Sequence, residues 1–211
     1  MDLASAMPTM VSTSATAEYQ LLTADDFLDW LEPGRRGDLI DGEKYMHSPV
    51  SFRHARLVNF LDFLIRSWIE RTGFGGELHR EVVAVRLDSR TVVIPDLGWF
   101  DPEQVSRFAP AYAPFAPRWV AEALSPRTAD RDIGPKFAGY ESAGVLEYWI
   151  LDPETLAHRF YRRDPAGEYL EEFAAGAEWI ESSVLKGLRV NRAWLNPYKL
   201  PSVDSCLAEI C

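Results

Sequence analysis

Residues 118–153 have the sequence RWVAEALSPRTADRDIGPKFAGYESAGVLEYWILDP, in which two apolar runs flank a helix-like segment. The runs Arg118–Leu124 and Leu146–Leu151 contain Val, Ile and aromatic residues, and both predict strands. Between them, Asp132–Ala143 carries apolar residues at helical spacing, and Pro135 suits the first turn of a helix. The order strand, helix, strand indicates an α/β fold of mixed α+β type.

Apolar spacing and turn residues predict further elements on both sides of this segment. Ser51–Thr72 has apolar residues at three- and four-residue steps and is followed by Gly73, which predicts a long amphipathic helix. The pair Asp41-Gly42 lies between two apolar-rich arms and predicts a hairpin, because both turn residues must accept positive φ. The other predicted elements are a short helix at Thr23–Leu31, strands at Glu81–Leu87 and Thr91–Phe100, a proline-rich loop at Phe108–Pro117, and a hairpin formed by Ala157–Arg162 and Glu168–Phe173.

The chain has 211 residues, enough for one domain with a sizeable core. We expect a flexible N-terminal tail at residues 1–20, one domain at 21–197 and a C-terminal tail at 198–211. Hydrophobic residues make up 47% of the chain and charged residues 26%. These fractions are typical of soluble globular proteins and argue against a disordered or fibrous chain.

Both ends of the chain give information about the cellular compartment of the protein. The two cysteines, Cys206 and Cys211, lie close together near the C-terminus, so they cannot cross-link the body of the fold. The first residues, MDLASAMPTMVSTSATAE, lack the basic and apolar regions of a secretory signal. No apolar run reaches the roughly 18 residues that a membrane helix needs. We therefore expect a soluble protein of the reducing cytoplasm, with no membrane partner.

Two acidic residues lie within apolar, strand-like sequence, where an unpaired carboxylate is costly to bury. Asp96 follows Pro95 in one predicted strand, and Glu122 interrupts the apolar run Trp-Val-Ala-Glu-Ala-Leu in the next. Carboxylates on neighbouring strands can converge on a hard cation such as Mg²⁺, which prefers oxygen ligands. The alternative is that each acid faces solvent at a sheet edge or pairs with an arginine.

Lys136 and Tyr140 are one helical turn apart and therefore lie on the same face of the predicted helix that follows Glu122. A lysine in this place can orient or deprotonate a water molecule, or stabilise negative charge on a phosphate. The ordinary alternative is a solvated surface lysine.

Three more residues are candidates by their position. Glu43 follows the predicted turn and can add a third carboxylate, although an exposed acid beside a turn is common. Arg53 and His54 open the long predicted helix, where they can contact a substrate phosphate beside the free backbone amides. A solvated helix start is the alternative for this pair.

Several other reaction classes lack their motifs. The chain has no Gly-x-Ser-x-Gly nucleophile elbow, no P-loop and no dinucleotide-binding fingerprint. The four histidines and two cysteines are not at zinc-ligand spacing. The sequence therefore argues against a serine hydrolase, a kinase and a zinc enzyme.

Six segments taken together resemble a known family. The chain is similar to the Uma-type restriction endonucleases, a branch of the PD-(D/E)XK nuclease superfamily, over roughly residues 20 to 195. The run from Ala121 to Pro153 is the most specific part. The segments are DLIDGEKYMHSP at 38–49, Arg53-His54, Ile94-Pro-Asp-Leu, AEALSPRT at 121–128, Lys136-x-x-x-Tyr140 and GVLEYWILDP at 144–153.

The resemblance implies a restriction-endonuclease-like core, with a mixed β-sheet flanked by helices. It also implies an acidic cluster that binds Mg²⁺ or Mn²⁺ and hydrolyses DNA with water. Asp96 and Glu122 match the superfamily's two acids and become the metal ligands, and the carbonyl of Ala123 completes the metal shell. The superfamily's lysine position holds Leu124 here, so Lys136 becomes the catalytic lysine, contributed from the following helix.

Other residues receive roles by the same resemblance. Glu43 matches the recurring Asp-Gly-Glu segment and is expected to be an accessory ligand or base. Arg53, His54 and Tyr140 are expected to contact the substrate. DNA is the expected partner, and a homodimer suits an enzyme that cuts both strands.

The net charge of -10 opposes this expectation, because phosphate neutralisation supplies much of the affinity of DNA-binding proteins. Bound divalent cations can offset the charge locally, or basic residues can cluster in the fold. A third explanation is a catalytically silent nuclease-fold module with a binding or regulatory role. The sequence leaves these alternatives open.

Overall fold

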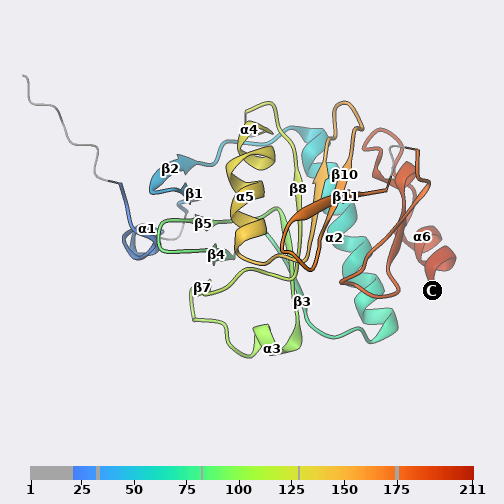
Figure 1. The fold of residues 1–211 in the computed structure, drawn as a ribbon. Helices are drawn as coiled ribbons and strands as arrows, with labels where there is room; N and C mark the ends of the chain where they lie inside the picture. Colours follow the sequence, from blue (N-terminus) through green and yellow to red (C-terminus); the bar gives the residue numbers. More distant parts are fainter. Residues whose placement is uncertain (1–20, 32–33, 82, 128, 174–175) are drawn as a thin grey trace, which may run out of the picture.

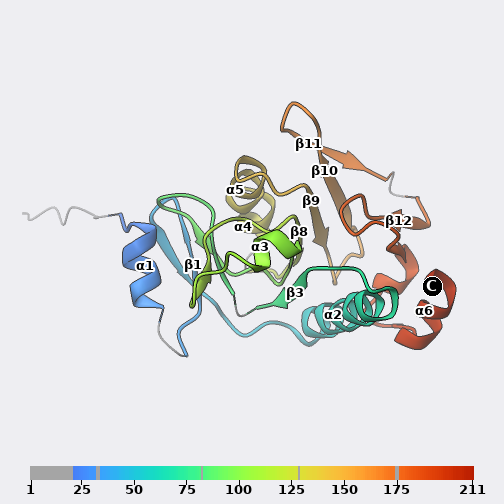
Figure 2. The ribbon, with the colours of Figure 1, turned by 90° about the horizontal axis from the view of Figure 1, so that it is seen from below.

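The structure is a computed structural model that describes residues 21–31, 34–81, 83–127, 129–173 and 176–211. Within these residues the chain forms a six-stranded sheet, a five-stranded sheet and a two-stranded hairpin, which we call the large sheet, the small sheet and the terminal hairpin. Helices lie on both faces of the large sheet (Figures 1 and 2). The expected mixed sheet flanked by helices is confirmed.

The large sheet has the strand order β11-β10-β9-β8-β6-β3. Its strands are antiparallel neighbours except for β8 and β9, which run parallel because the chain crosses over between them through two helices. All residues of β8 and β9 are buried, as expected for strands that are covered on both faces. The strands are β3 (Glu77–Arg80), β6 (Leu97–Phe100), β8 (Trp119–Ala123), β9 (Glu147–Leu151), β10 (Arg159–Arg163) and β11 (Tyr169–Glu172).

Helix α2 (Phe52–Thr72) covers one face of the large sheet. The hydroxyl of Ser51 caps its start by accepting the backbone N–H of His54, and Gly73 ends it with a φ of 67°. The predicted long helix is therefore confirmed. Its buried stripe packs on three tryptophans of the sheet, Trp99, Trp119 and Trp149, and on Ala121.

Two short helices, α4 (Ala129–Ile133) and α5 (Pro135–Ser142), cover the opposite face (Figure 1). The sequence predicted one helix here, but Gly134 adopts a φ of -112° and a ψ of -100° and breaks it. Pro135 then occupies the first turn of α5, as predicted. Tyr140 packs among the buried aromatic and branched side chains of this face.

The small sheet has the strand order β2-β1-β5-β4-β7. The hairpin of β1 and β2 turns at Asp41 and Gly42, whose φ angles are 51° and 84°, so the predicted turn is confirmed. Two residues of the proline-rich segment form β7, a strand that the sequence pattern did not predict. The strands are β1 (Gly37–Ile40), β2 (Glu43–Met46), β4 (Ala84–Arg86), β5 (Val92–Val93) and β7 (Tyr112–Ala113).

The predicted strand Thr91–Phe100 is divided between the two sheets, which corrects the sequence interpretation. Its first half is β5 in the small sheet, and its second half is β6 in the large sheet. Pro95 lies between them and has no N–H to donate to a ladder, so regular pairing stops there. Asp96 is consequently placed where the two sheets meet.

The C-terminal region is more ordered than the expected tail. Residues 198–211 include helix α6 (Val203–Ile210), whose Val203, Cys206 and Leu207 join the core cluster beneath α2 (Figure 2). The expected N-terminal tail at 1–20 lies outside the described residues. The remaining elements are α1 (Ala24–Trp30), α3 (Pro102–Val105), β12 (Trp179–Glu181) and β13 (Arg189–Asn191) of the terminal hairpin, and the 3-10 helix η1 (Arg192–Leu195).

The short helix α1 begins as the sequence predicts. The Thr23 hydroxyl accepts the backbone N–H of Asp26, and the Asp26 carboxylate accepts the backbone N–H of Thr23 in return. Among the helices that the structure describes, none has an apolar stretch suited to spanning a membrane.

Candidate active site

A cavity of about 850 Å³ opens where the small and large sheets meet. The helices α2, α4 and α5 also contribute to its wall. Acidic and basic side chains both reach it, and the acids are more numerous. The charged and histidine residues that line it are Arg36, Asp38, His47, His54, Glu81, Asp96, Glu122, Arg127, Asp132 and Lys136.

Lys136 connects three carboxylates in this cavity. Its Nζ atom lies 3.0 Å from Glu122 Oε1, 3.3 Å from Asp38 Oδ2 and 3.4 Å from Asp132 Oδ1. Burial lowers the pKa of Lys136, but the surrounding acids outweigh it and raise the pKa well above its ordinary value. Lys136 is therefore a buried ammonium, and the alternative of a solvated surface lysine does not apply.

Strand alternation directs Glu122 toward this lysine. Trp119, Ala121 and Ala123 face α2, so Val120 and Glu122 face the α5 side of the large sheet. The side chain of Glu122 accepts hydrogen bonds from the Lys136 ammonium at 3.0 Å.

Two more donors hold Glu122. Its Oε1 accepts the Tyr140 hydroxyl at 2.8 Å, and its Oε2 accepts the backbone N–H of Asp96 at 3.1 Å. Burial raises the pKa of Glu122 to about 8; Lys136 opposes this shift, while neighbouring acids such as Asp96 add to it. Three donors therefore hold this carboxyl group, and burial keeps its pKa above the ordinary value.

Asp96 is held by the next strand and by α2. Its Oδ2 accepts the backbone N–H of Ala123 at 2.7 Å and lies 3.1 Å from His54 Nε2. Burial raises the pKa of Asp96, but the hydrogen bond and charge of His54 outweigh it and leave the pKa below its ordinary value. Asp96 is therefore an ionised carboxylate at neutral pH.

His54 supports Asp96 from the first turn of α2. Its side chain is almost completely buried, and its Nδ1 has no hydrogen-bond partner among the described residues. Burial lowers the pKa of His54, but the hydrogen bond to Asp96 outweighs it and raises the pKa above its ordinary value. His54 therefore lies at the site, as expected, in contact with an acid.

Asp38 and His47 belong to the cavity, and the sequence interpretation missed both. Asp38 Oδ2 lies 3.1 Å from His47 Nε2, and Asp38 Oδ1 accepts the backbone N–H of Ile94 at 2.9 Å. Burial raises the pKa of Asp38, but Lys136 and His47 outweigh it and hold the pKa at about 2. The same signal that identified Asp96, an acid within an apolar arm, was present in Asp38-Leu-Ile.

Asp132 was also missed as a site residue. It lies one turn before Lys136, in α4, and its side chain is 4% exposed. Acidic residues are common in the first turns of helices, so nothing in the neighbouring sequence indicated that Asp132 would be buried against Lys136.

Three expected site residues do not line the cavity. Glu43 is exposed on β2 and accepts a hydrogen bond from the Tyr45 hydroxyl at 2.8 Å. Arg53 forms an ion pair with Glu154 at 2.7 Å. Tyr140 is fully buried behind Glu122, so it orients that carboxyl group and is shielded from any substrate in the cavity.

The position two residues after Glu122 is occupied by Leu124, which packs against the apolar cluster of the α5 face. Leucine has no ammonium group to offer there. The ammonium that contacts Glu122 belongs to Lys136 instead. Lys136 lies on α5, after the strand that carries Glu122.

The donor set suits a hard divalent cation. Asp96 and Glu122 offer carboxylate oxygens from adjacent strands, and Mg²⁺ commonly binds one or two carboxylates while it keeps several waters. No group of three or more His, Cys, Asp and Glu side chains in the described ranges is arranged to hold a metal ion. Glu122 contacts Lys136 instead. Burial is the main cause of the raised pKa of Glu122, and the neighbouring acids add to it, so a bound cation would offset the charge of those acids.

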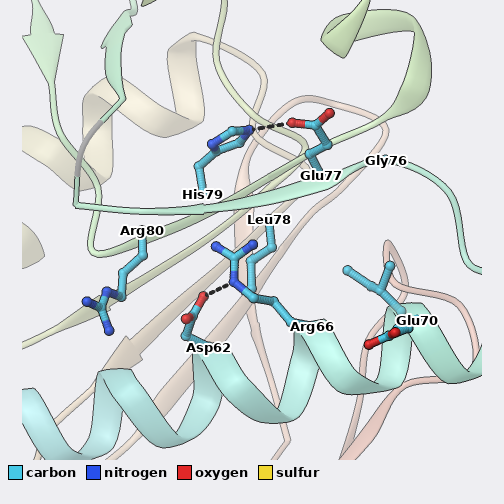
Figure 3. A pocket seen from close by; sticks show the side chains of 9 residues that line it. Asp62, Arg66, Glu70, Gly76, Glu77, Leu78, His79 and Arg80 are labelled. Carbon is cyan, nitrogen blue, oxygen red and sulfur yellow. Dashed lines mark hydrogen bonds and ion pairs between the residues drawn. The ribbon is translucent and has the colours of Figure 1, made fainter.

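A second hollow lies between α2 and β3, and two pairs of its polar side chains contact each other (Figure 3). Arg66 Nε donates to Asp62 Oδ1 at 2.7 Å, and His79 Nε2 lies 2.9 Å from Glu77 Oε2. None of the residues that line this hollow lines the larger cavity. We therefore take the larger cavity as the candidate active site.

The mixed sheet, the flanking helices and the acids around one lysine define a nuclease-type α/β domain. A family model described as "Uma2: Putative restriction endonuclease" matches residues 24–193, and the chain belongs to this Uma2 family. The resemblance found in the sequence motifs is thereby confirmed.

One solved structure supports the same fold. It is a crystal structure of "a putative nuclease belonging to DUF820 from Anabaena variabilis ATCC 29413", with a TM-score of 0.68 and 18% sequence identity. The match covers 82% of this chain and 97% of that chain, and at this identity it shows the fold. No curated protein sequence matches the chain.

Proposed function

We propose that this protein is a metal-dependent endonuclease that hydrolyses DNA phosphodiester bonds. The observation that carries the proposal is the convergence of Asp96, Glu122 and Lys136 in one cavity, with the lysine 3.0 Å from Glu122. Buried acids beside a buried cation are expensive to maintain without a function. The family description points to the same class of reaction.

Each residue has a proposed role. Asp96 and Glu122 hold Mg²⁺ or Mn²⁺, which when bound neutralises phosphate charge and makes a water molecule more acidic. Lys136 orients that water or stabilises negative charge on the phosphate. Asp38 fixes the ammonium of Lys136, and His54 fixes Asp96, in the way that outer hydrogen-bond partners orient metal ligands.

The proposal extends to the assembly and compartment. A homodimer would present two cavities to the two strands of a duplex. Cys206 and Cys211 are both free thiols, which suits the reducing cytoplasm.

Cleavage of plasmid and single-stranded DNA in Mg²⁺ or Mn²⁺ tests the proposal. We expect wild-type protein to cut and Asp96→Asn and Glu122→Gln to lose cleavage, because both changes keep the side-chain shape and remove a metal-binding oxygen. Glu43→Gln is the matched control, since its carboxylate is exposed and outside the cavity. Equal cleavage by Asp96→Asn would contradict the proposal. Cation binding without any cleavage would favour a catalytically silent nuclease-fold module.

A further inference from the structure

The segment between β2 and α2 exposes large apolar side chains beside the cavity. Met46 is 52% exposed, Val50 is 47% exposed and Phe52 is 77% exposed. Met46 and Val50 line the cavity directly, and Phe52 follows Ser51, which also lines it. Exposed apolar side chains gathered next to a cavity mark a binding surface more often than isolated ones do.

Arginine side chains stack on the aromatic rings of this surface. The Arg56 guanidinium lies 5.8 Å from the centre of the Phe52 ring, and the Arg53 guanidinium lies 5.4 Å from the centre of the Tyr198 ring. Tyr198 is 54% exposed, and its hydroxyl accepts a hydrogen bond from Arg53, the residue after Phe52, so a second accessible ring lies near the start of α2. Aromatic rings interleaved with guanidinium groups form flat surfaces on which nucleobases stack.

The charges of the same region are poorly suited to duplex DNA. Arg53 is already paired with Glu154 at 2.7 Å, and Arg36 lies 3.8 Å from Glu81. The whole chain carries a net charge of -10, which disfavours the duplex more than a single strand because the duplex has the higher phosphate charge density. Stacking on apolar rings avoids this difficulty, because it depends on the faces of the bases and less on the phosphates.

Base faces are accessible only where the bases are unpaired, since in a duplex they stack on one another. A protein that obtains its affinity from stacking therefore selects single strands or unpaired regions. Both the exposed rings and the unfavourable charge lead to this preference.

We propose that Met46, Val50, Phe52, Arg56 and Tyr198, which we call the stacking strip, bind the bases of single-stranded DNA beside the cavity. This inference rests on the proposed nuclease function and names its substrate class. The strand lies with its bases on the strip and its backbone toward Asp96 and Lys136.

Fluorescence anisotropy with labelled oligonucleotides tests the inference, in EDTA so that no cleavage occurs. The probes are a single strand of about 20 nucleotides, its duplex, and a strand of equal length with abasic sites, which keeps the phosphates and removes the bases. We expect wild-type protein to bind the single strand at least about fivefold more tightly than the duplex or the abasic strand.

The variants separate stacking from general surface effects. Phe52→Ala and Tyr198→Ala should each weaken single-strand binding by about 5- to 100-fold. Phe63→Ala is the matched control, because Phe63 is 62% exposed on the same helix and does not line the cavity. Its affinity should equal that of wild type.

The inference would be overturned by equal binding of single strand and duplex, by unchanged binding in Phe52→Ala, or by an equal loss in Phe63→Ala. The inference would also be overturned if Phe52→Ala lost self-association in a sedimentation experiment but kept its affinity for the single strand. The stacking strip would then be an interface between two copies of the chain. Duplex cleavage that requires Asp96, without a single-strand preference, would defeat this inference and leave the proposed nuclease intact. Phe52-dependent strand binding without cleavage would defeat only the nuclease.

Discussion

The Nζ atom of Lys136 lies 3.0 Å from Oε1 of Glu122, and both side chains are almost completely removed from solvent. Glu122 lies on β8, and Lys136 lies on α5 within the crossover that joins β8 to β9. Asp38 and Asp132 share the same ammonium. One ammonium therefore contacts acids from both sheets and from a helix.

Removing this ammonium should destabilise the protein. Lys136→Ala leaves three buried acids without their shared cation, and we expect the free energy of unfolding to fall by about 3 to 5 kcal/mol at neutral pH. Urea denaturation measures the change, and Lys186→Ala is the control because Lys186 is exposed. A loss no larger than that of the control would show that the ammonium is not needed to hold the acids.

Binding of a divalent cation should release a proton. The pKa of Glu122 is raised to about 8, so below this pH its carboxyl group is largely protonated and must ionise to bind a metal. We expect Mn²⁺ to displace about one proton near pH 6.5 and almost none near pH 9.5. Calorimetry in buffers with different ionisation heats measures this number.

The same titration has a clear control. Glu122→Gln cannot release this proton, whereas Glu43→Gln should behave as wild type because its carboxylate lies outside the cavity. Identical heats in all buffers at the lower pH would contradict the prediction.

Asp38 and Glu43 lie on the two arms of one hairpin and should differ sharply in mutational effect. Asp38→Asn removes one of the charges that hold Lys136, and we expect Mn²⁺ affinity or DNA cleavage to fall by about 10- to 100-fold. Glu43→Gln should leave both unchanged. A larger loss in Glu43→Gln than in Asp38→Asn would contradict this prediction and would place Glu43, and not Asp38, at the site.

His158 should make the protein sensitive to acid. Burial and the charge of Arg192 lower its pKa from 6.5 to about 4, while Asp152 opposes the shift. Between these pH values the unfolded chain binds more protons than the folded one, so stability is complete above pH 6.5 and falls as the pH approaches 4. The loss should be about 2 to 3 kcal/mol.

Denaturation at several pH values measures this dependence. His158→Gln should flatten the curve in this range, while His79→Gln should keep it, since the His79 side chain is 26% exposed. A curve that is unchanged in His158→Gln would assign the acid sensitivity to other groups.

Local features of the fold were predictable because they depend on neighbouring residues. The capping of α2 by Ser51 and its end at Gly73 follow from backbone chemistry within one turn. Gly134 was not recognised as a helix break, because a glycine inside a helical pattern is often tolerated. The division of Thr91–Phe100 between two sheets was also missed, since both halves have the same apolar character.

By itself the sequence determined the helices α1 and α2, the hairpin turn and the α/β class, and it singled out the acids Asp96 and Glu122, because a charge within an apolar run is a local anomaly. Only the tertiary structure decided which further side chains reach Lys136. Asp38 enters the cavity and Glu43 does not, although only four residues lie between them in one hairpin. The register places both side chains on the same face, but Glu43 lies beside the turn on the edge strand β2, whereas Asp38 lies at the other end of β1. There Ile94 and Lys136 contact Asp38, and these neighbours come from far along the chain, so the tertiary structure alone brings them together.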